Sequence, residues 1–99
     1  MAAELTITAA GAHTLVMVGE LDTHTATQLA EQLESIADGT PLVLDVAGVS
    51  FISSAGLSAI LTTQRRLDGS GGSLTLRSPT ATVARLVELS GLSDTLGFS

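Results

Sequence analysis

Hydrophobic and polar residues alternate in two short stretches near the start of the chain. Residues 5–8 alternate strictly, and residues 14–18 alternate more loosely. A period of two is typical of a strand with one buried face. The segment from Ala10 to His13 contains Gly11 and has the composition of a turn. The two stretches are therefore predicted to form an antiparallel hairpin.

Three later segments have one largely apolar face at helical spacing, namely residues 26–37, 57–64 and 83–90. Residue types that cap helices precede each segment: residues 22–25, with Gln28 three positions after Thr25, then Ser53-Ser54, then Ser78. Pro79 follows Ser78, so we expect it at the first position of the third helix. Gly91 is predicted to end that helix, with Leu92 folded back onto its last turn.

Two further strands are predicted between the helices. Residues 42–46 form a nearly continuous apolar run, which is typical of a central strand covered on both faces. Residues 73–76 alternate, and residues 94–99 are too short to assign beyond a final turn or strand. The order β-β-α-β-α-β-α predicts an α/β fold. We expect a small, mainly parallel sheet with an antiparallel edge strand and helices packed on it.

The length of 99 residues suits one compact domain that fills residues 1–99. The formal charge is −6, the chain has no lysine, and its cations are four arginines. Such a chain lacks the basic surface that binds nucleic acid or anionic membranes, and it complements a partner with a basic docking surface. The N-terminus has no secretory pattern and no apolar run spans a bilayer, so we expect a cytoplasmic protein.

The residues that enzymes use are scarce. There is no cysteine, and the histidines are His13 in the predicted turn and His24 at a predicted helix start. The sequence around Ser54 is not the G-x-S-x-G elbow of hydrolases. The glycine-rich residues 68–72 precede a strand, and there is no lysine to meet a phosphate. We therefore expect a binding protein, with no catalytic residues, metal or cofactor.

The junction from Phe51 to Leu57 admits two interpretations. Serines cap helices, and small residues let a helix start close to a strand, so the segment has a sufficient structural explanation. A serine at a helix N-terminus is also where an added phosphate is well tolerated, because free N–H groups and the helix dipole favour negative charge.

Three stretches together resemble a known family: Gly19-Glu20-Leu21-Asp22, Phe51-Ile52-Ser53-Ser54-Ala55-Gly56-Leu57, and Ala84 to Leu92. In this order and at these separations they look like the STAS domain of bacterial anti-sigma factor antagonists. The resemblance runs from about Leu5 to the end of the chain.

The resemblance implies a partner switch without enzyme activity in this chain. The unmodified protein would capture an anti-sigma factor that is also a serine kinase. Phosphorylation of Ser54 by that kinase would end the capture, and a serine phosphatase would restore it. The family pattern makes Asp22 a neighbour of the serine and indicates a partner-binding surface of Asp22, Ser53, Ser54, Gly56 and Leu57.

The sequence departs from the family pattern twice. Ser53 replaces the usual acidic residue, and Ala55 replaces a second hydroxyl residue. Ser53 is therefore a second candidate for phosphorylation. An alternative function needs the same fold and no phosphorylation: a constant scaffold subunit of a lipid-transport ATPase or of a stress-signalling complex.

Overall fold

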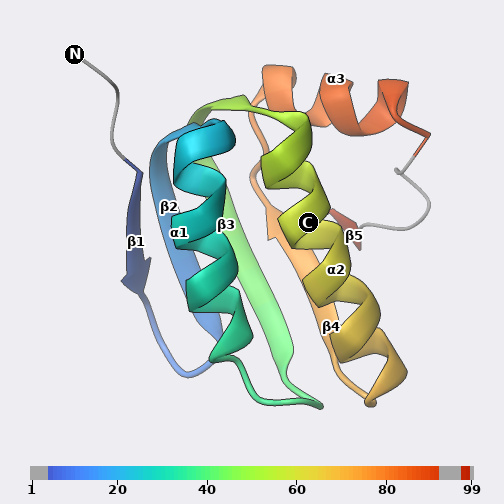
Figure 1. Cartoon of the computed structure of the whole chain (residues 1–99). Helices are drawn as coiled ribbons and strands as arrows, with labels where there is room; N and C mark the ends of the chain where they lie inside the picture. Colours follow the sequence, from blue (N-terminus) through green and yellow to red (C-terminus); the bar gives the residue numbers. More distant parts are fainter. Residues whose placement is uncertain (1–4, 92–96, 99) are drawn as a thin grey trace.

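A five-stranded sheet forms the centre of the structure, a computed structural model that describes residues 5–91 and 97–98 (Figure 1). The strands lie in the order β1-β2-β3-β4-β5, with β1 antiparallel to β2 and every other neighbouring pair parallel. The elements are β1 (Thr6–Ala9), β2 (Thr14–Leu21), α1 (Thr23–Glu34), β3 (Pro41–Ile52), α2 (Ser54–Gly69), β4 (Ser73–Arg77), α3 (Ala81–Leu89) and β5 (Gly97–Phe98). This confirms the predicted fold, including the antiparallel edge.

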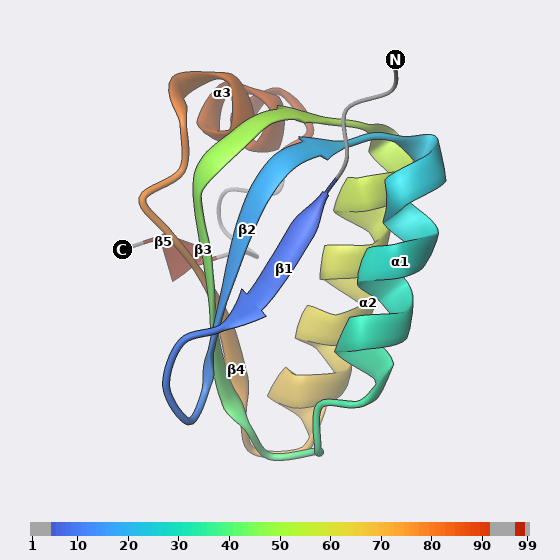
Figure 2. The same ribbon diagram turned by 90° about the vertical axis from the view of Figure 1, so that its left-hand side faces the viewer.

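The helices are distributed unequally over the sheet. Figure 2 shows α1 and α2 side by side on one face, while α3 lies on the other side, at the end where β3 finishes. The three helices are amphipathic, so each buries one stripe. The buried residues include Leu29 and Leu33 of α1, Ile60 and Leu67 of α2, and Val83 and Val87 of α3.

Strand β3 occupies the central position that its apolar run predicts. Leu42, Leu44 and Val46 are buried, whereas Val43 and Asp45 are only partly buried. The expectation that both faces of this segment are covered is therefore met only in part: α1 and α2 bury one face, and the face with Val43 and Asp45 is partly exposed. The strand also continues to Ile52, beyond the predicted residues 42–46.

The start of α3 differs from the prediction. Its N-cap is Thr80, whose Oγ1 accepts a hydrogen bond from the Val83 amide at 3.3 Å and donates one to the Val49 carbonyl at 3.1 Å. Ser78 instead has a φ of 55° and lies outside the helix, as does Pro79. Because Thr80 can bond to the Val49 carbonyl of β3, Thr80 rather than Ser78 is the N-cap of α3.

The end of α3 agrees with the prediction. Gly91 follows the C-cap residue Ser90 and has a φ of 73°, a conformation that glycine adopts without strain. The expected contact of Leu92 lies outside the described residues.

The start of α1 is also shifted. Asp22 is its N-cap and Thr25 is the third helical residue, so the reciprocal capping pair is Asp22 with Thr25 rather than Thr25 with Gln28. Gln28 points elsewhere: its Nε2 donates to the Leu5 carbonyl at 2.8 Å and so connects α1 to the start of β1.

Candidate functional site

The ends of β2 and β3 bring two separate sequence motifs together. Leu21 and Ile52 are register partners in the parallel pair, and the Ser53 amide donates to the Leu21 carbonyl at 2.7 Å. Asp22 and Ser53, the next residue in each case, therefore lie at the same edge of the sheet. The carboxyl edge of parallel strands is the usual place for binding sites in α/β folds.

The two serines at the start of α2 have different environments. Ser53 is the N-cap, and its Oγ accepts a hydrogen bond from the Gly56 amide at 3.1 Å. Ser54 is the first helical residue and is exposed. The hydroxyl of Ser53 is thus committed to capping, whereas Ser54 is an exposed residue with no capping role.

Gly56 and Leu57 lie beneath this surface. Both are buried, and a Cβ added to Gly56 would stand 2.5 Å from Cγ and 2.8 Å from Cδ2 of Leu21. No real Cβ is accommodated at such distances, so glycine allows α2 to start against the end of β2. The burial of these two residues packs the first turn of α2, which includes Ser54, against the core.

Asp22 is held in one orientation by Thr25. Its Oδ1 accepts from the Thr25 amide at 2.8 Å and from the Thr25 hydroxyl at 3.1 Å. The Glu20 carbonyl lies closer to the same Thr25 hydroxyl, at 2.8 Å, and shares its single proton with Asp22. The Thr25 amide is the main cause that lowers the pKa of Asp22 below its ordinary value. Asp22 is therefore a fixed negative charge at this edge.

Comparisons with known proteins establish the family of this chain. A family model described as "Mlab, STAS domain" matches residues 5–97. The chain belongs to the STAS domain family. It is 32% identical over 84 residues to the anti-sigma-B factor antagonist of Bacillus subtilis, covering 84% of this chain and 77% of the relative.

Solved STAS structures have the same fold. An anti-sigma factor antagonist from Mycobacterium paratuberculosis superposes with a TM-score of 0.80 at 25% identity, covering 98% of this chain and 85% of that one. The Bacillus cell fate determinant SpoIIAA in its phosphorylated form gives 0.71 at 24% identity, covering 97% and 91%. Anti-sigma factor antagonists are non-enzymatic regulators, in agreement with the expected binding role.

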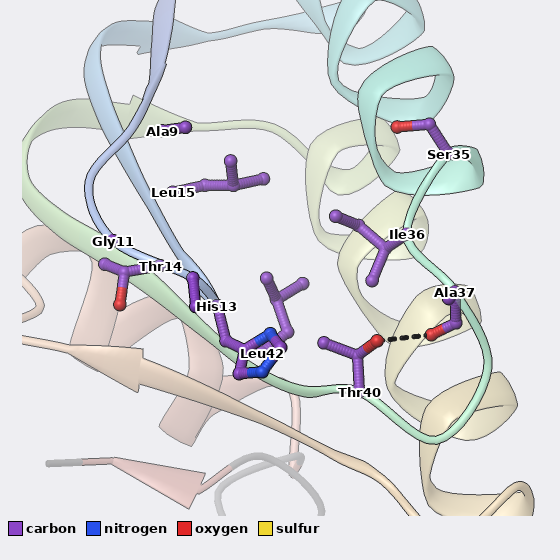
Figure 3. Close-up of a pocket in the computed structure, with 11 residues that line it drawn as sticks. Ala9, Gly11, His13, Thr14, Leu15, Ser35, Ile36, Ala37, Thr40 and Leu42 are labelled. Atoms are coloured by element: carbon purple, nitrogen blue, oxygen red, sulfur yellow. Dashed lines mark hydrogen bonds between the residues drawn. The ribbon is translucent and has the colours of Figure 1, made fainter.

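Within this STAS domain, His13 is far from Ser54. It lines a pocket of about 320 Å³ between the β1–β2 turn and the end of α1 (Figure 3). That pocket lies near the start of β2, and Ser54 follows strands that finish at the opposite edge. Eight residues of strand separate the two ends by roughly 25 Å. His13 therefore cannot act as a base for Ser54.

Two further observations concern metal binding and membrane insertion. No group of three or more metal-ligating side chains gathers within residues 5–91 and 97–98. In the same part of the chain, no helix has the length and hydropathy needed to cross a bilayer.

Two features of the site were not singled out from the sequence. Glu20 pairs in register with Phe51, so a second acidic residue lies beside the motif that contains Ser54. Phe51 itself is 45% exposed. The signal for Glu20 is its position two residues before Asp22, whereas an exposed phenylalanine in a strand has no sequence signal.

Proposed function

We propose that this STAS domain is an anti-sigma factor antagonist whose capture of an anti-sigma serine kinase is switched by phosphorylation of Ser54. The observation that carries the proposal is the contrast between the two serines. Ser54 is exposed at the first position of α2, while the Ser53 hydroxyl is bonded to the Gly56 amide. A kinase therefore finds Ser54 accessible, and a serine phosphatase finds the same group when it reverses the modification.

The expected effect of the phosphate differs between the free protein and the complex. At the helix start the dipole stabilises a negative group by about 0.3–1 kcal/mol, and the carboxylate of Asp22 at the same edge opposes it. Folding stability should therefore change little. In an interface, the added charge of about −1.5 to −2 has to be desolvated against a surface shaped for a hydroxyl. Binding should therefore weaken strongly.

The relatives support this direction. The Bacillus subtilis protein is an antagonist of an anti-sigma factor, and SpoIIAA exists in a phosphorylated form. The acidic character of the site, with Glu20 and Asp22 near Ser54, suits a kinase that presents basic side chains.

Substitution of Ser54 tests the switch. Ser54→Glu should leave the melting temperature within a few degrees but weaken binding to the kinase by more than a hundredfold, which corresponds to about 3 kcal/mol. Ser54→Ala should bind as tightly as the wild type and accept no phosphate. Titration calorimetry and intact-mass measurement with the purified kinase and ATP provide both readouts.

The control is Ser53→Ala. It should lose about 0.5–2 kcal/mol of stability through the missing cap and still be phosphorylated on Ser54. Full phosphorylation of Ser54→Ala would move the switch to another residue, with Ser53 the first to examine.

A second candidate function is favoured by Ser53 itself, since the antagonist pattern has an acidic residue there. A scaffold subunit of a transporter or stress-signalling complex needs no phosphorylated serine. This function would replace the first if no serine kinase of the source organism modifies the protein and it copurifies in fixed stoichiometry with a transporter ATPase.

A further inference from the structure

An apolar groove lies between the end of β3 and α3. Its volume is about 290 Å³, and it is lined by Phe51, Ile52, Thr82, Arg85, Leu86 and Leu89. Phe51 is three residues from Ser54, so their Cα atoms are at most about 11 Å apart. In Figure 1, α3 and the start of α2 lie at the same end of the molecule. The groove therefore borders the surface that contains Ser54.

The position of α3 creates this groove. Val83 and Val87 are buried, and the Thr80 hydroxyl bonds to the Val49 carbonyl of β3. This leaves a neighbouring stripe of α3, with residues 82, 85, 86 and 89 at helical spacing, beside Phe51. One wall of the groove is therefore formed by α3, and the opposite side of α3 is packed in the core through Val83 and Val87.

The exposed apolar residues of the described chain are concentrated here. Val18, Phe51 and Leu89 are its large exposed hydrophobic residues, and two of them line the groove. Leu89 is 74% exposed. Single exposed apolar residues are ordinary, but a cluster of them is characteristic of protein-binding surfaces.

The charges around the groove are divided by sign. Arg85 is exposed at the groove, whereas the ion pairs among the described residues involve Arg66 and Arg77. On the other side of Phe51 stand its register partner Glu20 and, two residues further, Asp22. A partner that covers both sides must therefore present opposite charges to them.

We propose that this groove is the second half of the docking surface for the anti-sigma serine kinase. It takes an apolar side chain of the kinase, and a kinase carboxylate beside that side chain pairs with Arg85. Basic groups of the kinase face Glu20 and Asp22. This arrangement sets the register in which the kinase meets Ser54. The inference rests on the proposed function, and it adds a contact that does not involve the phosphorylated serine.

Binding titrations with purified anti-sigma kinases of the source organism, taken one at a time without ATP, test the groove. Leu89→Ser and Arg85→Glu should each weaken binding at least tenfold while the melting temperature stays within a few degrees, since both side chains are exposed. Arg65→Glu is the matched control. It makes the same charge change at an exposed position of α2 outside the groove, and it should bind within twofold of the wild type.

The charge of the partner is tested by reversal. Substitution of the contacting kinase carboxylate by arginine should restore most of the binding that Arg85→Glu loses. Two results would overturn the groove but not the switch: wild-type binding by Leu89→Ser and Arg85→Glu when Ser54→Glu fails to bind, or tighter binding by Arg85→Glu. If no kinase binds the wild-type protein, both proposals are wrong.

Discussion

Adjacent small residues at the start of α2 have unrelated physical roles. Ser53 supplies an oxygen to the Gly56 amide, Ser54 is exposed, and Gly56 allows close contact with Leu21. The Ser53 role needs a hydroxyl that accepts a hydrogen bond, the Ser54 position presents an exposed hydroxyl, and the Gly56 role needs the absence of a Cβ. Substitutions separated by one or two positions should therefore have different consequences.

Gly56→Ala should destabilise the domain by about 1–3 kcal/mol. The new methyl group would lie 2.5 Å from Cγ of the fully buried Leu21, so either Leu21 or the start of α2 has to move. The control is Gly69→Ala in the last turn of the same helix, where nothing lies within 4 Å. That change should be neutral or stabilising by up to about 1 kcal/mol. Urea denaturation measures both, and equal stabilities would contradict the packing of α2 against β2.

At the scale of elements, hydrogen bonds from the cap or first turn of each helix attach it to the sheet; in α2 the bond is that of the Ser53 amide to the Leu21 carbonyl. Thr25, in the first turn of α1, bonds to the Glu20 carbonyl of β2, and the Thr80 cap bonds to the Val49 carbonyl of β3. These bonds connect helices to strand ends, so a cap here fixes tertiary position as well as helix length. For Asp22 the cap also carries a charge, which makes its contribution dependent on pH.

Stability should fall in acid partly through Asp22. Its pKa is lowered in the folded state, chiefly by the Thr25 amide, so the unfolded chain binds a proton more readily. The contribution is therefore present above a pH of about 4 and is lost as pH falls through the folded-state pKa. Asp22→Asn keeps a good cap without the charge, so its melting temperature should decline less between pH 6 and pH 3 than that of the wild type.

Asp45 is the internal reference for this measurement. The Ala47 amide first, and then Arg77, lower its pKa as well. Some acid dependence should therefore remain in Asp22→Asn and decrease further in the double variant with Asp45→Asn. Identical acid profiles for the wild type and Asp22→Asn would show that the Asp22 charge does not contribute.

Across the whole molecule, two of the four arginines hold elements together. Arg66 Nη1 donates to the Ile36 carbonyl at 2.9 Å and to Asp38, and its Nη2 donates to the Leu33 carbonyl at 2.9 Å. Arg66 of α2 therefore satisfies carbonyl groups at the C-terminal end of α1 and links the two helices. Arg77 pairs with Asp45 across β3 and β4. The arginines outside these pairs, Arg65 and Arg85, are both exposed and lie on different helices.

The isolated protein should therefore show no saturable binding of ATP. A nucleotide triphosphate needs several cations or a glycine-rich loop before a helix, and the chain has a formal charge of −6 and no lysine. Titration calorimetry with Mg-ATP should give only heats of dilution, while the kinase alone provides the positive control. Stoichiometric binding to the protein alone would contradict a purely regulatory role.

The part of the site that lies in short continuous sequence motifs was predictable. The resemblance named Asp22, Ser53 and Ser54, and the ends of parallel strands bring those motifs to one edge. The exposure of Phe51 and the groove beside it were not predictable. A large apolar residue in a strand is normally expected to be buried, and the sequence pattern around Phe51 is the same whether its side chain is buried or exposed. The exposure of Phe51 depends on where α3 packs.

The sequence by itself determined the element order as far as α3, the antiparallel edge and the apolar helix faces, because the periods of two and 3.6 are local properties of the backbone. The final strand β5 was left open between a turn and a strand, because its two residues are too few for a period. It also determined the stop at Gly91, which needs only a residue that tolerates positive φ. Tertiary structure alone decided that Thr80 rather than Ser78 caps α3 and that β3 extends to Ile52. Both depend on hydrogen bonds between residues that are distant in the sequence, such as Thr80 to Val49 and Ser53 to Leu21. A pattern read over a few neighbouring residues carries no information about such bonds.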